Sequence, residues 1–392
     1  MAMDRLFSLM AEKKASDVYL APGSPVHIRI NGVSIPVNQQ TLDGAAVETL
    51  LREVLTERQW QTFLDRRELN IGYGVRGVGS YRINVFQQRG TPAAVVRYIP
   101  GEIPSLDTLK LPTVLAELVV ERRGLILVVG STGSGKSTTI ASMIDHRNAQ
   151  RSGHILTFED PIEFVFRNKR SIVNQRQIGS DTDSLAIGLK NAMRQAPDCI
   201  LIGEIRDVET MSAAIAYAQS GHLVLATLHA NNAHNALNRI VSFYPPENRR
   251  VMLADLAATM RAIVSQRLVR AKDGNRQPVV ELLLNTRHVA ELVEQGQLTE
   301  VKEAMEKSLA PGSQTFEQAL VSLLKAQVIS REDALAHADS PTNLLWLLEN
   351  AGLSESWPSE APPVSRGAGA RPPGSPADKD ADASFSEFLL NI

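Results

Sequence analysis

The sequence predicts a mixed α/β protein whose larger part is a mostly parallel sheet covered by helices on both faces. A continuous apolar run, Leu125 to Val129, is typical of a strand buried on both faces. It leads into Gly130-x4-Gly135-Lys136-Ser137, and a helix-like segment, Thr138–Arg147, follows. Three more short apolar runs are separated by helix-length segments: Ile155–Phe158, Ile200–Ile202 and Leu223–Ala226. Strands that alternate with helices in this way favour parallel pairing.

The glycine-rich segment has the spacing and the residue types of a phosphate-binding loop. Glycines let backbone N–H groups curl around phosphate oxygens, Lys136 brings a positive charge to the β- and γ-phosphates, and the Ser137 hydroxyl can bind Mg2+. A helix that begins near Lys136 adds its positive dipole end. A flexible glycine turn is the alternative, but the flanking strand and helix argue against it. The expected nucleotide-binding residues are Gly130, Ser131, Thr132, Gly133, Ser134, Gly135, Lys136, Ser137 and Thr138.

Length and composition favour two folded domains followed by a tail. The chain has 392 residues, of which 43% are hydrophobic and 21% charged, as is ordinary for a globular protein. Its net charge of -2 gives no overall attraction to nucleic acid or to an anionic membrane. The single cysteine, Cys199, excludes an internal disulfide framework and a four-cysteine zinc site, and a reducing cytoplasm fits. No segment reaches about 18 consecutive apolar residues, so membrane association is expected only through a partner.

The chain divides into four parts. Residues 1–100 are expected to form a small α+β domain, and prolines punctuate a linker at 101–112. Residues 113–354 hold the nucleotide-binding core and further helices. From 355 to 392 the chain is rich in Pro, Ser, Ala, Gly and Asp, which predicts a disordered tail. Its end, 385–392, has apolar residues at helical spacing, which predicts either a partner-docking motif or a segment that packs on the protein's own surface.

Apolar spacing also predicts elements within each domain. In the first domain we expect a helix over Glu48–Leu64 and two paired strands, Tyr81–Phe86 and Ala93–Ile99, that carry Arg82 and Arg97 at polar positions. Beyond about residue 242 the pattern turns helical. The helices expected there are Met252–Leu268, His288–Ser308 and Thr315–Lys325.

Carboxylates follow two predicted strands of the core. Glu159, Asp160 and Glu163 come after the second apolar run, and Glu204 comes after the third. Hydrolysis of a bound nucleotide needs a group that orients water and groups that neutralise the charge on the transferred phosphoryl. Because the carboxyl ends of neighbouring parallel strands lie beside the phosphate loop, Glu163 and Glu204 are the leading candidates. The alternative is that some of these acids are helix caps or solvated turn residues.

Two histidines and two arginines are further candidates. His222 and His229 flank the fourth predicted strand and are placed to sense phosphate, although a lone histidine is more often a structural residue. Arg82 and Arg97 cannot be assumed to reach the nucleotide of their own chain. In a ring of subunits they could contact a neighbour's nucleotide as arginine fingers, whereas salt bridges on a polar sheet face are the alternative.

Several ordered motifs resemble those of a known family. Ala15-Ser16-Asp17 and Tyr81-Arg82-Ile-Asn-Val-Phe lie in the first domain. Glu159-Asp160-Pro161-Ile-Glu163-Phe is similar to the family's aspartate box, Gly203-Glu204-Ile-Arg206-Asp207 to its Walker B segment, and the stretch from Gly221 to His229 to its histidine box. With the phosphate loop, these motifs resemble the hexameric secretion ATPases, and more closely the type IV pilus retraction ATPases of the PilT/PilU kind.

The resemblance implies a RecA-like P-loop ATPase core, a PAS-like N-terminal domain and a homohexameric ring that uses ATP and Mg2+. ATP turnover would remove pilin from the fibre at the cytoplasmic face of an inner-membrane platform protein, with no nucleic acid as a partner. The implied roles are Ser137 and Glu204 at the metal, Glu163 as general base, His222 and His229 in coupling nucleotide state to domain movement, and Arg82 and Arg97 as fingers.

Some features depart from the family's patterns. Assembly and type II secretion ATPases usually carry a four-cysteine zinc site. The single cysteine of this chain therefore argues for the retraction branch. The major retraction motor has a helix reading Ala-Ile-Arg-Asn-Leu-Ile-Arg-Glu, whereas the stretch here is Glu300-Val-Lys-Glu-Ala-Met-Glu-Lys307. This difference and the long tail resemble the accessory, PilU-like branch, which acts beside a paralogous retraction ATPase. No acid precedes Glu204, because Gly203 occupies that position. The alternatives are a regulatory or scaffold ring subunit that acts on a paralogous motor, a type II secretion or assembly ATPase, and a nucleic-acid translocase.

Overall fold

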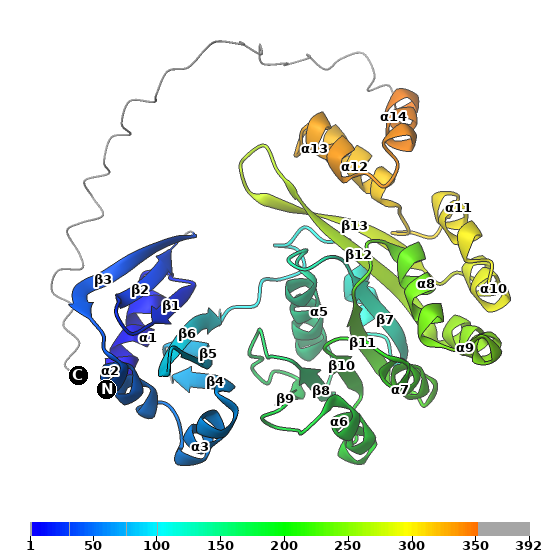
Figure 1. Ribbon diagram of the computed structural model, residues 1–392. Coiled ribbons are helices and arrows are strands. Elements are labelled where there is room, and N and C mark those ends of the chain that lie inside the picture. Colours follow the sequence, from blue (N-terminus) through cyan, green and yellow to red (C-terminus); the bar gives the residue numbers. More distant parts are fainter. Residues whose placement is uncertain (1, 31, 76, 100, 352–392) are drawn as a thin grey trace, which may run out of the picture. The chain divides into compact units, whose positions relative to one another are not determined.

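A computed structural model describes residues 2–30, 32–75, 77–99 and 101–351. It contains two compact units, one ending at Glu102 and the other beginning at Ile103 (Figure 1). The predicted tail at 355–392, with its docking motif, lies outside the described residues. Among the helices of the described ranges, none is both long and apolar enough to cross a membrane.

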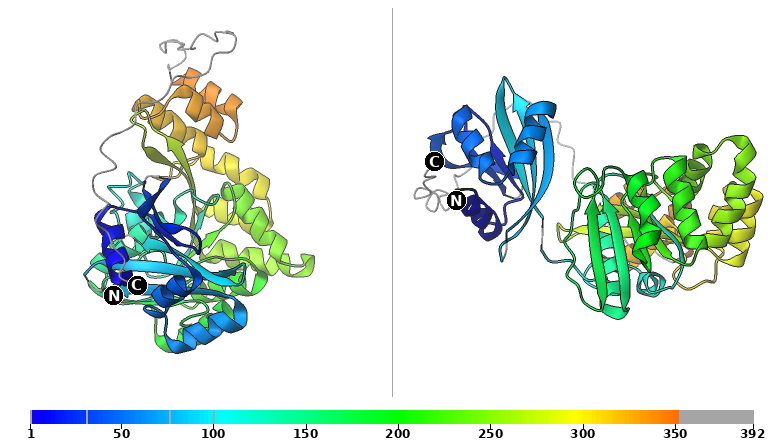
Figure 2. Two further views of the ribbon diagram at one scale, coloured as in Figure 1. Left: turned by 60° about the vertical axis from the view of Figure 1, so that its left-hand side comes forward. Right: turned by 90° about the horizontal axis from the view of Figure 1, so that it is seen from below.

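The N-terminal unit is an antiparallel sheet with the order β3-β2-β1-β6-β5-β4 (Figures 1 and 2). Its strands are β1 (Asp17–Leu20), β2 (Pro25–Ile30), β3 (Val33–Thr41), β4 (Glu68–Val75), β5 (Gly79–Gln88) and β6 (Thr91–Ile99). Alternate residues such as Val18, Ile83 and Val96 form a core with the apolar side of α1 (Ala2–Glu12). The strands predicted around Arg82 and Arg97 are confirmed as β5 and β6.

The single helix predicted over Glu48–Leu64 is wrong, because two helices occupy this region. They are α2 (Gly44–Arg52) and α3 (Glu57–Arg66). Thr56 caps α3 by accepting a hydrogen bond from the backbone N–H of Gln59, whose side chain in turn accepts one from the backbone of Thr56. This capping box starts a new helix within an apolar pattern that continues across the break.

The C-terminal unit is a seven-stranded sheet with the order β13-β12-β7-β11-β10-β8-β9. Every neighbouring pair is parallel except β12 with β13. All four strands predicted from apolar runs are confirmed, as β7, β8, β10 and β11. The strands are β7 (Gly124–Val129), β8 (Gly153–Glu159), β9 (Ser171–Gln177), β10 (Cys199–Ile202), β11 (Leu223–Leu228), β12 (Met260–Arg270) and β13 (Arg276–Leu284).

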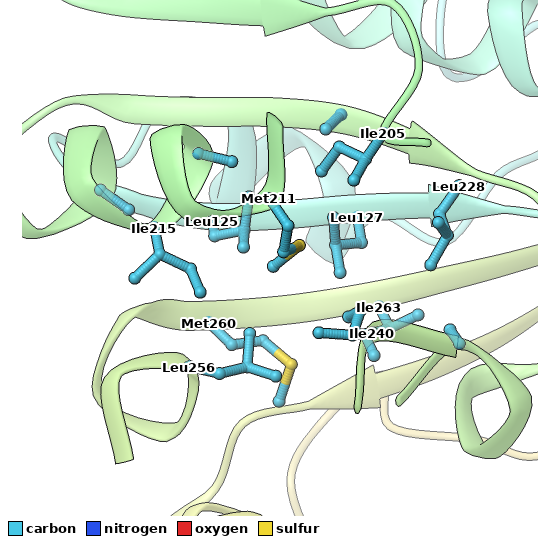
Figure 3. Packing of buried hydrophobic residues seen from close by; sticks show 14 of the residues in the cluster. Leu125, Leu127, Ile205, Met211, Ile215, Leu228, Ile240, Leu256, Met260 and Ile263 are labelled. Atoms are coloured by element: carbon cyan, nitrogen blue, oxygen red, sulfur yellow. The ribbon is translucent and has the colours of Figure 1, made fainter. Parts of the chain in front are cut away.

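Helices cover both faces of this sheet, as expected for an α/β core. They are α4 (Val114–Val119), α5 (Lys136–Gln150), α6 (Leu185–Ala192), α7 (Val208–Gln219), α8 (Ala233–Phe243) and α9 (Pro246–Thr259). Leu125 and Leu127 of β7 pack with Met211 of α7 and Leu256 of α9 (Figure 3). Val128 belongs to the other core, which includes apolar residues of α5. Burial on both faces explains why β7 is a continuous apolar run.

The helix predicted over Met252–Leu268 is wrong in its second half. The helix α9 ends at Thr259, and the strand β12 follows at once. The buried run Ala262-Ile-Val264 pairs with β7, and short apolar runs of this kind fit a strand and a helix equally well. Because β12 and its antiparallel partner β13 were not expected, neither were the contacts that they make with the phosphate loop.

The last three helices of the described chain, α12 (Phe316–Lys325), α13 (Arg331–His337) and α14 (Pro341–Asn350), pack on the β12–β13 hairpin, where Val269 and Val279 join their core. The two helices before them, α10 (Arg287–Gln295) and α11 (Val301–Glu306), instead pack in the core that contains Leu125 and Met211. The helix predicted at Thr315–Lys325 is confirmed, with Thr315 as its cap. The single helix predicted over His288–Ser308 is wrong, since α10 ends at Gln295 and is capped by Gly296, whose φ of +75° suits glycine.

Arg267 of β12 ties these helices to the sheet. Its guanidinium donates a hydrogen bond of 2.5 Å to the carbonyl oxygen of His337 and forms an ion pair with Asp339. It also donates a hydrogen bond of 3.2 Å to the carbonyl oxygen of Asn231, which follows β11. The guanidinium carbon lies 3.9 Å from the centre of the Phe316 ring. One side chain therefore connects the end of β11 with the C-terminal helices.

Beside this connection, β13 buries a carboxyl group at the start of α8. Glu281 accepts hydrogen bonds of 2.6 Å from the backbone N–H of Ala233 and 2.9 Å from the Ser265 hydroxyl. Burial raises the pKa of Glu281 to about 7, and the two hydrogen bonds oppose that rise. The carboxyl group ionises near its ordinary pKa of 4.5 in the unfolded chain, but it stays protonated up to about pH 7 in the folded protein. The free energy of unfolding therefore falls as the pH rises from about 4.5 to about 7.

We expect Glu281→Gln to remove this loss of stability. Between pH 5 and pH 8 the free energy of unfolding of the variant should rise by about 2 kcal/mol relative to that of the wild type. Urea unfolding at both pH values measures the difference, with Glu291→Gln on the exposed face of α10 as the control. A gap between variant and wild type that is the same at both pH values would contradict the prediction.

Candidate active site

The phosphate loop has a backbone shape that requires glycine. Gly130, Gly133 and Gly135 have φ values of +154°, +79° and +89°. A Cβ atom added at Gly130 would lie 2.6 Å from the carbonyl oxygen of Gln266, and one added at Gly135 would lie 2.6 Å from the amide nitrogen of the same residue. The glycines therefore serve both the turn itself and its close approach to β12.

Lys136 begins α5 and lies under the influence of two carboxylates. Its Nζ donates hydrogen bonds of 2.9 Å to the carbonyl oxygens of Gly130 and Ser131. Burial lowers the pKa of Lys136, while the charges of Glu204 and Glu163 act to raise it. The two predicted catalytic carboxylates thus act on the same ammonium group, although they follow different strands.

A cavity of about 850 Å³ lies at this edge of the sheet. Its walls are the phosphate loop, the start of α5 and the segments after β8, β10 and β11. This volume is within the range of roughly 300–1,000 Å³ that is usual for small-molecule sites. The predicted site residues that line it are Thr132, Gly133, Gly135, Lys136, Ser137, Thr138, Glu163, Glu204 and His229. Gly130 and Ser131 instead supply carbonyl groups to Lys136, and Ser134 is buried behind the loop.

Glu204 is contacted through both of its carboxylate oxygens. Its Oε2 accepts a hydrogen bond of 2.7 Å from Nε of Arg206 and forms an ion pair with Nη2 at 2.6 Å. Its Oε1 lies 3.2 Å from Nε2 of His229. The order of the strands explains this meeting, because β10 and β11 are adjacent and parallel and so end at the same edge.

Glu163 and Glu159 have different surroundings after β8. Glu163 is exposed on the cavity wall. Glu159 accepts hydrogen bonds of 2.6 Å from the Thr157 hydroxyl and 3.0 Å from the Gln175 amide. Burial raises the pKa of Glu159, and these bonds oppose the rise. A general base must be free to contact water, so Glu163 fits that role better than Glu159.

The structure explains why no acid precedes Glu204. A Cβ atom at Gly203 would lie 2.9 Å from the carbonyl oxygen of Phe158 and 3.3 Å from Cα of Glu159. The Thr227 hydroxyl also donates a hydrogen bond to the Gly203 carbonyl. Position 203 is thus packed between two strand ends, where a carboxylate side chain would not fit.

The two predicted histidines lie at opposite ends of β11. His229 follows the strand and lines the cavity, whereas His222 precedes the strand. At 3.3 Å per residue the six-residue strand separates them by roughly 20 Å. His222 lies within hydrogen-bond distance of Ser220 and Tyr217. The structure therefore brings only His229 to the carboxylates.

Arg82 and Arg97 belong to the N-terminal unit and are direct neighbours across β5 and β6. Nε of Arg97 donates a hydrogen bond of 2.8 Å to the carboxylate of Asp17, which is buried in the sheet. The salt bridge that was the alternative for these arginines is thus present for Arg97. For Arg82, the described residues supply no ion pair.

Gln266 is a site residue that the sequence analysis missed. Its side chain is buried, and its amide nitrogen donates a hydrogen bond of 2.8 Å to the carbonyl oxygen of Ser134. Its amide oxygen accepts one of 2.6 Å from the Thr139 hydroxyl. Both ends of one amide therefore hold the phosphate loop and the start of α5. No sequence signal marked it, because the contact depends on the pairing of β12 with β7.

We expect Gln266→Met to weaken nucleotide binding about tenfold. The variant keeps the shape of the side chain but leaves two buried polar groups of the loop unpaired, which costs roughly 1–3 kcal/mol each. Titration with a fluorescent ATP analogue measures the affinity. Gln314→Met is the matched control, since it loses a hydrogen bond to Val280 that lies outside the loop. Unchanged affinity in the Gln266 variant would contradict a positioning role.

The side-chain oxygen atoms near Lys136 are suitable ligands for a Mg2+ ion that binds together with a nucleotide. No group of three or more His, Cys, Asp or Glu side chains is placed to hold a metal by itself within the part of the chain that the structure describes. The Ser137 hydroxyl and the Glu204 carboxylate line the same cavity, and Mg2+ usually takes one or two protein oxygens, with phosphate and water as its other ligands. These two residues therefore fit a magnesium that arrives with phosphate.

A second cavity, of about 390 Å³, adjoins the phosphate loop. It shares Gly135, Thr138 and Leu268 with the first cavity, and the β12–β13 hairpin forms one of its walls. A nucleotide with its phosphates at Lys136 would have space there for its nucleoside part.

With an ammonium group for phosphate and carboxylates from neighbouring strands beside it, the C-terminal unit has the organisation of a P-loop nucleotide hydrolase. Comparison with known proteins agrees with this class of protein. Residues 102–334 match the family described as Type II/IV secretion system protein.

Two relatives from Pseudomonas aeruginosa cover nearly the whole chain. The type IV pilus ATPase PilU is 43% identical over 91% of this chain and 94% of its own length. The retraction ATPase PilT is 35% identical over 88% of this chain and 100% of its own length. A crystal structure of the pilus retraction motor PilT with bound ADP has a TM-score of 0.82 and 39% identity, and it covers 88% of this chain and 98% of that one. This chain therefore belongs to the type II/IV secretion ATPase family, among the pilus retraction ATPases of the PilT/PilU type, and it is an ATPase.

Proposed function

We propose that this chain forms a hexameric ring that uses Mg2+ and ATP to drive type IV pilus retraction and twitching, as an accessory to a paralogous retraction ATPase. The observation that carries the proposal is the cavity in which the Lys136 ammonium, Glu204 and Glu163 meet at the phosphate loop. Its relatives supply the biological setting, since PilU and PilT are both named as type IV pilus ATPases.

In this proposal each residue of the cavity has one task. Backbone N–H groups of the loop and Lys136 hold the β- and γ-phosphates. Ser137 and Glu204 would bind Mg2+, which neutralises charge on the phosphates when it is bound. Glu163, exposed on the cavity wall, accepts a proton from the attacking water. His229 stays beside Glu204 and responds to changes around that carboxylate.

The arginines of the N-terminal unit would complete the site of a neighbouring subunit. Asp17 accepts a hydrogen bond of 2.8 Å from Arg97, and the pairing of β5 with β6 places the two arginines on one face of the sheet. Arg82 lies next to Arg97 and has its guanidinium available for a phosphate. His222 lies at the far end of β11, away from the cavity. Its role in this proposal is to make contacts between subunits or domains that change with the bound nucleotide.

An accessory role fits the C-terminal helices better than an independent motor. The helix α11 contains Lys302, Glu303 and Glu306, where the family's main motor has a helix with two arginines. The partners in this role are the paralogous retraction ATPase and the pilus platform protein at the cytoplasmic face of the inner membrane. A scaffold ring that binds ATP without using its energy is the second candidate, because the same changed helix would suit it.

Deletion of this chain in a strain that keeps the paralogue tests the proposal. We expect reduced twitching and more surface pili, restored by the wild-type gene and not by the Lys136→Ala gene. Full rescue by Lys136→Ala would favour the scaffold, and normal retraction after deletion would contradict the proposed role. Light scattering of the purified protein with and without ATP measures whether the ring is a hexamer.

A further inference from the structure

We propose that Arg206 is a positioning residue that holds the Glu204 carboxylate away from Mg2+ until a magnesium nucleotide displaces it, and that it takes the carboxylate back when product leaves. This inference rests on the proposed function of the cavity as a Mg2+ and ATP site. It adds a task for a residue that neither the sequence analysis nor the family resemblance gave a role.

The geometry gives Arg206 a direct hold on Glu204. Nε of the guanidinium donates a hydrogen bond of 2.7 Å to Oε2, and Nη2 forms an ion pair with the same oxygen at 2.6 Å. His229 lies 3.2 Å from the other oxygen. Both oxygens of the carboxylate are thus engaged by neighbouring side chains, and charge-assisted bonds of this length are among the stronger ones in proteins.

A magnesium ion at Glu204 would compete with this arrangement. Mg2+ needs oxygen lone pairs and negative charge from the carboxylate, and the guanidinium uses the lone pairs of Oε2 and neutralises the same charge. Two cations that share one carboxylate also repel each other. Glu204 can therefore serve the metal fully only after Arg206 has moved.

Arg206 is placed so that it can move. Its side chain is 66% exposed, whereas that of Glu204 is 23% exposed, so the arginine swings into solvent while the carboxylate stays in the wall. Arg206 and a second carboxylate, that of Asp160, line the same cavity. When Mg2+ takes Glu204, Asp160 is therefore a further carboxylate in this cavity with which the guanidinium can pair.

Binding of Mn2+ to the full-length protein in the presence of saturating ADP tests this inference. Mn2+ substitutes for Mg2+ and its free concentration is read by electron paramagnetic resonance, without any turnover. We expect Arg206→Gln to bind Mn2+ about three- to fivefold more tightly than the wild type, which corresponds to removing an exposed ion pair. Arg206→Lys should lie between the two, because it keeps the positive charge and loses the Nε hydrogen bond to Glu204.

Two controls separate a competing arginine from other roles. Arg287→Gln removes an arginine that is paired with Glu291 on α10, and it should leave Mn2+ affinity unchanged. ADP affinity in EDTA should be equal in wild type and both Arg206 variants, which shows that the pocket is folded.

Three results of these binding measurements would contradict a proposal. Unchanged Mn2+ affinity in Arg206→Gln would mean that the ion pair is only a surface contact, and weaker affinity would mean that Arg206 contacts the phosphates. Either result overturns the inference and leaves the proposed function standing. A wild-type protein that binds neither ADP nor Mn2+ would overturn the proposed function as well.

Discussion

Lys136→Ala is expected to abolish ATP hydrolysis, with a fall in kcat/KM of at least about a thousandfold. The ammonium group is the only lysine charge in the larger cavity of the described structure, and it opposes the negative charge that the phosphates carry in both the ground state and the transition state. Because the charges of Glu163 and Glu204 also act at this position, removing the lysine leaves carboxylates to repel the incoming phosphate.

Phosphate release by the purified protein and binding of a fluorescent ATP analogue together measure this effect. The matched control is Lys190→Ala on the exposed side of α6, which should behave as the wild type does. Turnover within tenfold of the wild-type rate in the Lys136 variant would place hydrolysis outside this cavity.

Glu163→Gln is expected to slow turnover by about 10²–10⁴-fold while ATP binding changes little. Gln keeps the size of the side chain and cannot accept a proton from water. Since Glu163 is exposed on the cavity wall and its charge still acts on Lys136, its removal should strengthen the hold on ATP slightly rather than weaken it.

A filter assay after mixing the protein with ATP separates binding from chemistry. The Glu163→Gln variant should retain bound ATP that is recovered unhydrolysed. The control, Glu294→Gln on α10, should hydrolyse ATP normally. If ATP affinity and rate fall together in Glu163→Gln, the residue acts in binding and another group is the base.

The central part of the fold could be predicted because its signals are local. Each of β7, β8, β10 and β11 is a short apolar run, since each is buried on both faces of the sheet. The phosphate loop is recognised from adjacent residues in sequence. Glu163 and Glu204 could be paired with it because parallel strands end at a common edge.

The other parts depend on contacts between distant segments. The strand β12 has an apolar pattern that also fits a helix, and only its pairing with β7 brings Gln266 to Ser134 and Thr139. The bond from Arg206 to Glu204 depends on side-chain directions after β10, which no spacing rule gives.

For the two histidines, the length of the strand between them was enough to predict which one reaches the site. They flank one strand, so a strand length of roughly 20 Å already implies that only one of them can reach the phosphate edge. That distance was available from the sequence, and it singles out His229, which follows the strand and lies beside Glu204.

A structure of the full-length protein with Mg2+ and a non-hydrolysable ATP analogue would test the proposed site directly. We expect the β- and γ-phosphates within hydrogen-bond distance of the Lys136 ammonium, with the metal between Ser137 and Glu204 and with Glu163 facing the γ-phosphate. Phosphates bound elsewhere, or a Glu163 side chain turned out of the cavity, would contradict this expectation.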